Sequence, residues 1–209
     1  MKRYIICLLA LPGLFALTLN NGFAKEMTGK EIYKYCKACH GDRAQGGENG
    51  KYPKLAGLPK EYLARQLMDF KQETRANKPM IPVIKHVNFD AEIIEKVSAY
   101  MAGLTEPNLF LWPYEVDKEI LSKFKSRQAF ATAGRDAYNK ECADCHGDAA
   151  QGKAEHQAPP LVNQYPQYIA KQMRDFAEGL RSHEHSNACG SLDNTQRESV
   201  LYHLVELGK

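Results

Sequence analysis

The chain contains the pattern Cys-x-x-Cys-His twice, as CKACH at residues 36–40 and as CADCH at residues 142–146. This spacing is typical of the covalent attachment of c-type haem. The two thiols form thioether bonds to the haem vinyl groups, and the adjacent histidine becomes an axial ligand of the iron. A redox-active cysteine pair that precedes a histidine is the alternative for one copy, but two copies argue against it. The residues predicted to attach and ligate haem are Cys36, Cys39, His40, Cys142, Cys145 and His146.

The two motifs belong to a longer repeat. Residues 36–75 align with residues 142–181 without a gap, at a constant offset of 106 residues. A constant offset with many matched residues indicates a duplicated unit. A unit of about 80 residues has only a marginal core of its own, and a covalently held haem adds to that core. Matched pairs include Gly41/Gly147, Gln45/Gln151, Pro53/Pro159, Leu55/Leu161, Tyr62/Tyr168, Gln66/Gln172, Asp69/Asp175 and Arg75/Arg181.

The first residues have the three parts of a secretory signal peptide. Two basic residues precede the apolar run at residues 4–17, and small residues stand before a cleavage point after Ala24. An uncleaved membrane anchor is the alternative, but the run is shorter than the roughly 20 residues that a spanning helix needs, and Pro12 interrupts it. We therefore predict a signal peptide at residues 1–24 and a periplasmic location for the rest of the chain.

The remaining sequence indicates helices in both units. Thr28 and Glu31 form a capping-box pattern, and apolar residues recur at helical spacing in EYLARQLMDF, YIAKQMRDF and AEIIEKVSAYMAGL. We predict an N-terminal domain at residues 25–104, a linker at 105–129 and a C-terminal domain at 130–209. The linker carries Trp112 and other aromatic residues, so we expect it to pack along the boundary between the domains.

On these motifs the chain resembles the two-domain dihaem cytochromes c, cytochrome c4 and its relatives. The resemblance covers nearly all of the chain after the signal peptide. It rests on CKACH and CADCH, on the Gly-Asp pair after each, on Pro53 and Pro159, and on the stretch from YLARQLMDF to NKPM. It implies an all-α fold of two tandem class I cytochrome c domains, each around one covalently bound haem c. It also implies that the Pro53 and Pro159 carbonyls accept hydrogen bonds from the proximal histidines, a contact that orients a ligating imidazole.

The resemblance implies that a methionine is the second axial ligand, and Met80 in RANKPM stands at the family's position. The second unit departs from this pattern, because the offset of 106 carries Met80 onto Ser186. Met173, inside a helical stretch, is expected to be a core residue. A deletion of one residue in this loop brings His185 into the ligand position. His183 and Cys189 are the alternatives to His185, and an open or water-bound iron is the remaining one.

A bis-histidine site has a lower reduction potential than a His/Met site, so the two haems are expected to differ. The main hypothesis is an electron carrier that exchanges single electrons with other redox proteins and has no catalytic residues. The rival is a dihaem enzyme acting on a small sulfur compound such as thiosulfate, because Cys189 lies beside the abnormal ligand loop. A dedicated subunit that docks on a larger redox enzyme is a third hypothesis.

The net charges of the two predicted domains say less about binding partners than the motifs do. Residues 25–104 hold 14 basic and 10 acidic residues, a balance of +4, whereas residues 130–209 hold 8 and 11, a balance of −3. Complementary charge often guides the encounter of redox partners. The sequence has no basic stripe with interleaved aromatic residues, so we expect no nucleic-acid binding and at most a peripheral association with membranes.

Overall fold

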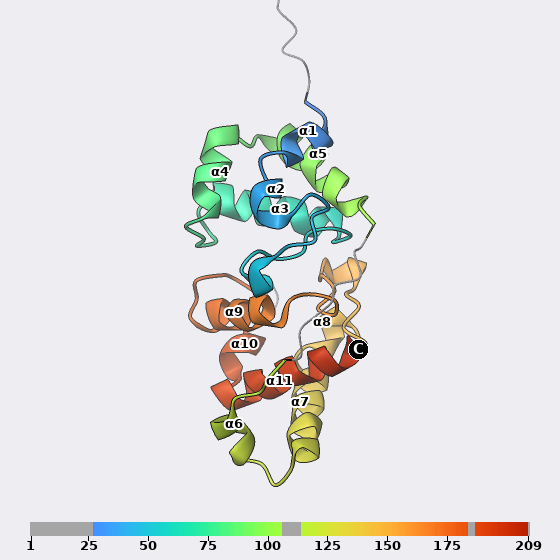
Figure 1. Ribbon diagram of the computed structural model, residues 1–209, viewed down its shortest axis with the longest axis vertical. Helices are drawn as coiled ribbons and strands as arrows, with labels where there is room; N and C mark the ends of the chain where they lie inside the picture. Colours follow the sequence, from blue (N-terminus) through green and yellow to red (C-terminus); the bar gives the residue numbers. More distant parts are fainter. Residues whose placement is uncertain (1–26, 106–113, 184–186, 209) are drawn as a thin grey trace, which may run out of the picture.

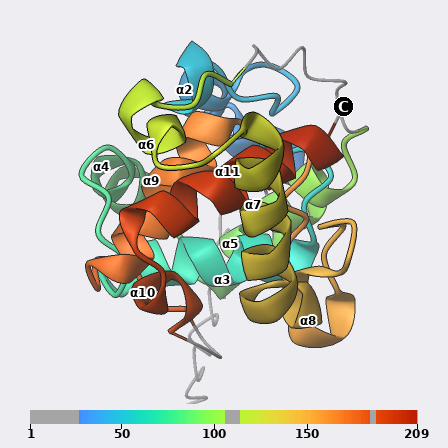
Figure 2. The same ribbon diagram turned by 90° about the horizontal axis from the view of Figure 1, so that it is seen from below.

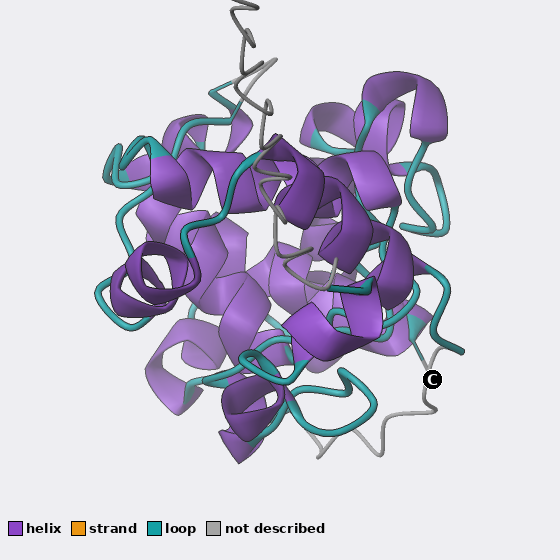
Figure 3. Cartoon of the chain, turned by 90° about the horizontal axis from the view of Figure 1, so that it is seen from above, coloured by secondary structure: helices purple, strands orange, loops and turns teal. Residues whose placement is uncertain are grey.

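The structure is a computed structural model of the 209-residue chain, and it describes residues 27–105, 114–183 and 187–208. These residues form helices and loops without a regular strand, apart from two isolated bridges, Gly47 with Tyr52 and Lys153 with Ala158. Figure 3 shows this all-helical composition by colour. Two helical units are stacked along the long axis of the molecule (Figure 1). The predicted all-α architecture is therefore confirmed for the described part of the chain.

In the N-terminal unit, α1 and α3 both pack on α5, and α4 packs on α3. The predicted capping box is present at the start of α1, where Thr28 and Glu31 bond reciprocally. The face predicted for EYLARQLMDF is the buried face of α3, because Tyr62, Leu63, Gln66, Leu67 and Phe70 are all buried. The elements are α1 (Gly29–Tyr33), α2 (Lys37–His40), η1 (Glu48–Gly50), α3 (Lys60–Lys71), α4 (Met80–Val87) and α5 (Ala91–Ala102).

The C-terminal unit repeats this arrangement with longer terminal helices. The helix before the second Cys-x-x-Cys-His motif, α7, crosses α11, and α9 packs on both α10 and α11. Figure 2 shows α11 running across α7. The elements are α6 (Lys118–Ser122), α7 (Arg127–Glu141), α8 (Ala143–His146), η2 (Ala154–His156), α9 (Pro166–Ala177), α10 (Ala188–Ser191) and α11 (Asn194–Leu207).

A glycine lies at each helix crossing. A Cβ atom at Gly29 of α1 would lie 2.2 Å from the Lys96 carbonyl oxygen of α5, and one at Gly134 of α7 would lie 2.0 Å from the Ser199 carbonyl oxygen of α11. Both distances are far below van der Waals contact. In each unit the helix before the Cys-x-x-Cys-His motif and the last helix therefore approach so closely that only glycine fits between their backbones.

The predicted linker does not pack along the domain boundary at residues 114–129, so the expectation is wrong for this part of it. Val116 and Ile120 are buried against Phe130 and Tyr202, in a small cluster formed by α6, α7 and α11. This cluster lies at the end of the C-terminal unit that is remote from α3 (Figure 1). Trp112 lies outside the described residues. The linker aromatic residues that can be placed extend the C-terminal core, and the predicted domain bounds stay a prediction.

Among the described residues, no helix is both long and apolar enough to cross a membrane. The predicted signal peptide lies outside the described residues.

Candidate functional site

Both motif histidines are held in the same way. The Nδ1 atom of His40 lies 3.0 Å from the Pro53 carbonyl oxygen, and Nδ1 of His146 lies 3.0 Å from the Pro159 carbonyl oxygen. A carbonyl oxygen only accepts, so Nδ1 carries the proton and Nε2 keeps the lone pair that a metal needs. Burial lowers the pKa of both His40 and His146. Each imidazole is therefore kept neutral, oriented and ready to ligate through Nε2.

The motif cysteines are thiols, and the cysteines of the described residues are not paired in disulfides. Burial raises the pKa of Cys36 to about 12 and that of Cys142 to about 12. In each unit a tyrosine hydroxyl just upstream donates to the carbonyl after the motif. Tyr33 bonds to Gly41 at 2.7 Å, and Tyr138 bonds to Gly147 at 2.6 Å. These bonds hold the short motif helix against the longer helix that precedes it.

Both motifs open onto one continuous cavity of about 570 Å³. All four motif cysteines and both motif histidines line it, and much of the rest of its wall is apolar. Thiol pairs, imidazoles with exposed lone pairs and an apolar wall are the groups that covalently attached haem requires. The residues present therefore fit haem c at both motifs. Apolar lining residues include Leu58, Leu63, Leu67, Phe70, Val97, Ile169, Val200 and Leu204.

The residues considered for the second axial ligand differ between the units. Met80 is the first residue of α4, half-buried, and lines the cavity. Met173 is buried in the core of the C-terminal unit, as predicted. His185 and Ser186 lie outside the described residues.

The two alternatives to His185, His183 and Cys189, both line the same cavity. The centroid of the His183 ring lies 6.3 Å from that of His146, with the ring planes at 65°, and 4.9 Å from the ring of Phe176. Cys189 is half-buried on α10, and burial raises the pKa of its thiol.

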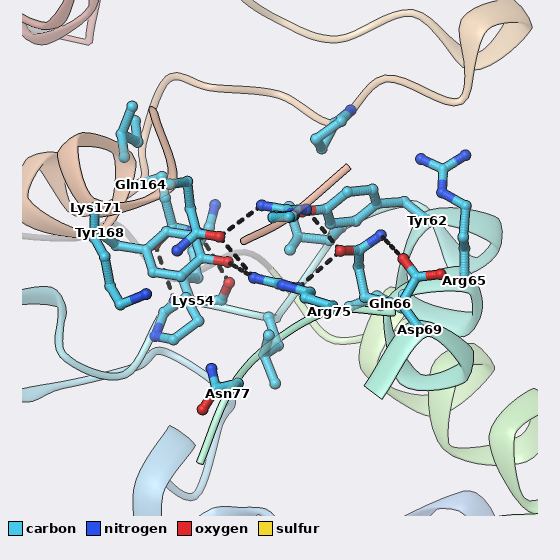
Figure 4. A pocket seen from close by; sticks show the side chains of 18 of the residues that line it. Lys54, Tyr62, Arg65, Gln66, Asp69, Arg75, Asn77, Gln164, Tyr168 and Lys171 are labelled. Carbon is cyan, nitrogen blue, oxygen red and sulfur yellow. Dashed lines mark hydrogen bonds between the residues drawn. The ribbon is translucent and has the colours of Figure 1, made fainter. Parts of the chain in front are cut away.

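Between the units lies a buried polar cluster that the sequence analysis did not assign. Arg75 donates from Nη1 to Gln66 Oε1 at 2.7 Å within its own domain. It also donates from Nη2 across the interface to the Tyr168 hydroxyl at 3.0 Å and to Gln172 Oε1 at 2.8 Å. Figure 4 shows Arg75 between Tyr168 and Gln66.

Arg181 makes the corresponding set of bonds from the other domain. It donates from Nη1 to Gln172 Oε1 at 2.7 Å, and from Nη2 to the Tyr62 hydroxyl at 3.0 Å and to Gln66 Oε1 at 2.6 Å. Both guanidinium groups also lie over a phenylalanine ring of their own domain, each at 4.5 Å from the ring centroid. We call these six residues, Tyr62, Gln66, Arg75, Tyr168, Gln172 and Arg181, the arginine clasp. The only hint in the sequence was that all three of its pairs recur at the repeat offset.

The clasp is linked to one carboxylate in each domain. The Nε2 atom of Gln66 donates to Asp69 at 3.3 Å, and Nε2 of Gln172 donates to Asp175 at 3.3 Å. Each glutamine thus accepts from both arginines through its oxygen and donates to its own aspartate through its nitrogen. These bonds satisfy the buried polar atoms of the clasp and fix their orientation. A buried polar network is stable only when its members have hydrogen-bond partners.

Comparison with known proteins places this geometry in a family. The model of the cytochrome c family matches residues 27–105 and 131–199. A cytochrome c4 from Thiocapsa roseopersicina is 34% identical over 151 residues, covering 71% of this chain and 72% of that protein. A thiosulfate dehydrogenase electron acceptor from Stutzerimonas stutzeri (strain A1501) is 26% identical over 206 residues, covering 94% of this chain and 91% of that protein.

The fold also matches a solved structure. The crystal structure of reduced recombinant cytochrome c4 from Pseudomonas stutzeri superposes with a TM-score of 0.65 at 23% identity, covering 84% of this chain and 95% of that chain. This likeness concerns the fold alone. It confirms the predicted class, all-α with two tandem class I cytochrome c domains. Cytochrome c domains carry covalently bound haem c, and two such domains imply two haems. The chain belongs to the cytochrome c family and is a dihaem, cytochrome c4-like member of it.

Proposed function

We propose that this protein is a periplasmic electron carrier that accepts single electrons from one redox protein and delivers them to another. The observation that carries the proposal is the single cavity onto which both haem-attachment motifs open. Haem supplies a one-electron iron couple when it is bound. The protein attaches and orients each haem and surrounds it with apolar side chains. The arginine clasp fixes the two domains relative to each other, and with them the two haem sites.

For the N-terminal haem we propose His40 and Met80 as axial ligands. His40 presents a neutral imidazole whose Nδ1 proton is bound by Pro53. Met80 lines the same cavity at the start of α4. A thioether ligand opposite an imidazole raises the reduction potential.

For the C-terminal haem we propose two histidine ligands, His146 and a histidine from the loop before α10. The sequence favours His185, and His183 is the alternative whose ring lies near His146 among the described residues. Two imidazoles on one metal ion have ring centroids roughly 6 Å apart, because each metal–nitrogen bond is about 2 Å long. The centroids of the His146 and His183 rings are 6.3 Å apart, a spacing compatible with this arrangement. We therefore take His183 as the ligand to test first and His185 as its competitor.

The rival proposal, an enzyme acting on a small sulfur anion, has less support. An anion site needs cationic groups, and Arg181 is the cation nearest the unusual loop in the sequence. Its guanidinium is buried and makes three hydrogen bonds within the arginine clasp. The relative from Stutzerimonas stutzeri is named an electron acceptor of thiosulfate dehydrogenase. That name supports a redox enzyme as the donor, and we propose an enzyme that oxidises a sulfur compound as one such donor.

Near-infrared magnetic circular dichroism of the oxidised protein tests these assignments, since its charge-transfer bands identify axial ligand pairs. We expect one His/Met signal and one bis-His signal in the unaltered protein. The bis-His signal should be lost in His183→Ala and kept in His185→Ala and Cys189→Ala. Loss in His185→Ala alone would transfer the assignment to His185. A thiolate or high-spin signal in place of bis-His would contradict the electron-carrier proposal and favour the enzyme.

A further inference from the structure

One peptide group of the N-terminal domain is hydrogen-bonded on both sides. The carbonyl of Pro53 accepts from Nδ1 of His40 at 3.0 Å. The N–H of the same peptide group belongs to Lys54, and it donates to Oε1 of Gln164 at 3.0 Å. Gln164 lies in the C-terminal domain, 110 residues further along the chain. His40, one peptide group and Gln164 therefore form a continuous hydrogen-bond relay that crosses the domain interface.

The orientation of the Gln164 amide is fixed by its other bonds. Its Nε2 donates to the Lys54 carbonyl at 3.0 Å, and its Oε1 also accepts from the backbone N–H of Tyr165 at 3.1 Å. Gln164 is 7% exposed and Lys54 is 1% exposed, so water competes little for these bonds. Gln164 and Lys54 lie beside each other in Figure 4.

The second repeat lacks the relay. The carbonyl that holds His146 belongs to the peptide group between Pro159 and Pro160. Proline has no backbone N–H, so this peptide group accepts from His146 but donates to nothing. At the offset of 106 the counterpart of Gln164 is Leu58, which carries no polar atom in its side chain. The relay therefore acts on one of the two haems only.

We propose that Gln164 of the C-terminal domain is a positioning residue for the haem of the N-terminal domain, which it influences through the Pro53–Lys54 peptide group and His40. The inference rests on the proposed function in taking His40 as an axial ligand. A peptide group whose N–H donates carries more negative charge on its oxygen, because consecutive hydrogen bonds polarise one another. The Pro53 oxygen then binds the Nδ1 proton more strongly, and Nε2 becomes a stronger donor. A stronger donor favours ferric iron and lowers the reduction potential of the N-terminal haem.

The test is a redox titration of the haem-loaded protein combined with nuclear magnetic resonance of the reduced form. In Gln164→Leu we expect the potential of the N-terminal haem to rise and that of the C-terminal haem to stay unchanged. The Nδ1 proton resonance of His40 should move towards that of a weaker hydrogen bond, while the His146 resonance, an internal control, stays in place. Gln164→Asn keeps the amide but withdraws it by one carbon, so it should weaken the same hydrogen bonds with Lys54 and move the His40 resonance the same way by a smaller amount. If Gln164→Leu does not fold, the His40 resonance of this second variant tests the relay.

The matched control is Gln157→Asn, which removes a different cross-domain hydrogen bond, the one between Arg65 and Gln157 Oε1 at 2.8 Å. It should leave both the potential and the His40 resonance unchanged. Equal shifts of both haems in Gln164→Leu, or the same shifts in Gln157→Asn, would show general loosening of the interface and overturn the relay. An unaltered protein without the His/Met charge-transfer signal would overturn the assignment of the N-terminal ligands, and the relay with it. Loss of the relay alone leaves that signal intact.

Discussion

Arg75 and Arg181 each bind the glutamine of the opposite domain, Arg75 to Gln172 Oε1 at 2.8 Å and Arg181 to Gln66 Oε1 at 2.6 Å. Both arginines are buried, at 6% and 8% exposure. A buried guanidinium is tolerated because its donors are matched by acceptors, and loss of one partner leaves the others unsatisfied. Because each arginine binds a glutamine of the opposite domain, the stability of each domain depends on the other.

The first prediction concerns the hydrogen bonds that Arg181 makes in the arginine clasp. Arg181→Gln should lower the free energy of unfolding of the haem-loaded protein by about 3 kcal/mol, because three charge-assisted hydrogen bonds are lost in a buried site. The two domains should then unfold in separate transitions, which chemical denaturation followed by circular dichroism would detect. Arg65→Gln is the matched control. Arg65 is half-buried and also bonds across the interface, but its hydrogen bonds are exposed to solvent, so its loss should cost less than about 1 kcal/mol. An equal decrease in the free energy of unfolding in Arg181→Gln and Arg65→Gln would contradict the prediction.

The second prediction concerns Met80. Met80→Ala should abolish the His/Met charge-transfer signal and lower the potential of the N-terminal haem, because the thioether that stabilises ferrous iron is removed. Near-infrared spectroscopy and a redox titration measure the two effects. Met173→Leu is the control, since Met173 is buried in the C-terminal core and a volume-conserving change there should keep both signals. Retention of the His/Met signal in Met80→Ala would refute the assignment.

The third prediction concerns Gly134, where two opposing effects can be compared. Replacing a helical glycine by alanine stabilises an exposed helix by about 1 kcal/mol. In α7, however, the new Cβ would lie 2.0 Å from the Ser199 carbonyl oxygen, and forced separation of packed elements costs about 1–3 kcal/mol or more. We therefore expect Gly134→Ala to lower the thermal midpoint of the C-terminal domain. Gly103→Ala has its nearest neighbour atom at 3.4 Å and should leave the midpoint nearly unchanged. A rise in the midpoint of Gly134→Ala would exclude the close crossing.

The fourth prediction concerns pH. Burial, followed by the nearby charge of Arg135, lowers the pKa of His203 on α11. The unfolded chain therefore binds more protons at this residue near its ordinary pKa of about 6.5, so this contribution to stability is lost as the pH falls through that value. His203→Phe keeps an aromatic ring against Tyr138, whose ring centroid lies 5.3 Å from that of His203. Thermal midpoints at pH about 7.5 and about 5.5 should differ less in the variant. An identical pH dependence of the thermal midpoint in His203→Phe and the unaltered protein would contradict the lowered pKa of His203.

Features that depend on local sequence were predicted well. The buried face of α3 follows from the helical spacing of Tyr62, Leu67 and Phe70, because a helix buries whichever side carries the apolar residues. The capping box at Thr28 depends on two residues three positions apart. The contacts of His40 and His146 with prolyl carbonyls were implied by the family resemblance, and both are present.

Features that depend on how the two domains meet could not be predicted in this way. Gln66 and Gln172 occupy core-facing positions of their helices, yet nothing within a helix shows that their partners lie in another domain. Lys54 is charged in sequence and almost fully buried in the structure. The relay through Gln164 joins residues 110 positions apart, and no periodicity links them. For residues 114–129 the linker prediction failed for the same reason, because apolar residues indicate burial but not the surface that buries them.

The arginine clasp also bears on the origin of the two-domain chain. Each domain supplies one tyrosine, one glutamine and one arginine, and each set binds its copy across a pseudo-twofold axis. An interface of this type is self-complementary, so one domain alone carries both halves of it. The chain is thus organised like a homodimer whose subunits have been joined end to end. Joining them makes their association intramolecular, so formation of the clasp does not depend on the concentration of the protein.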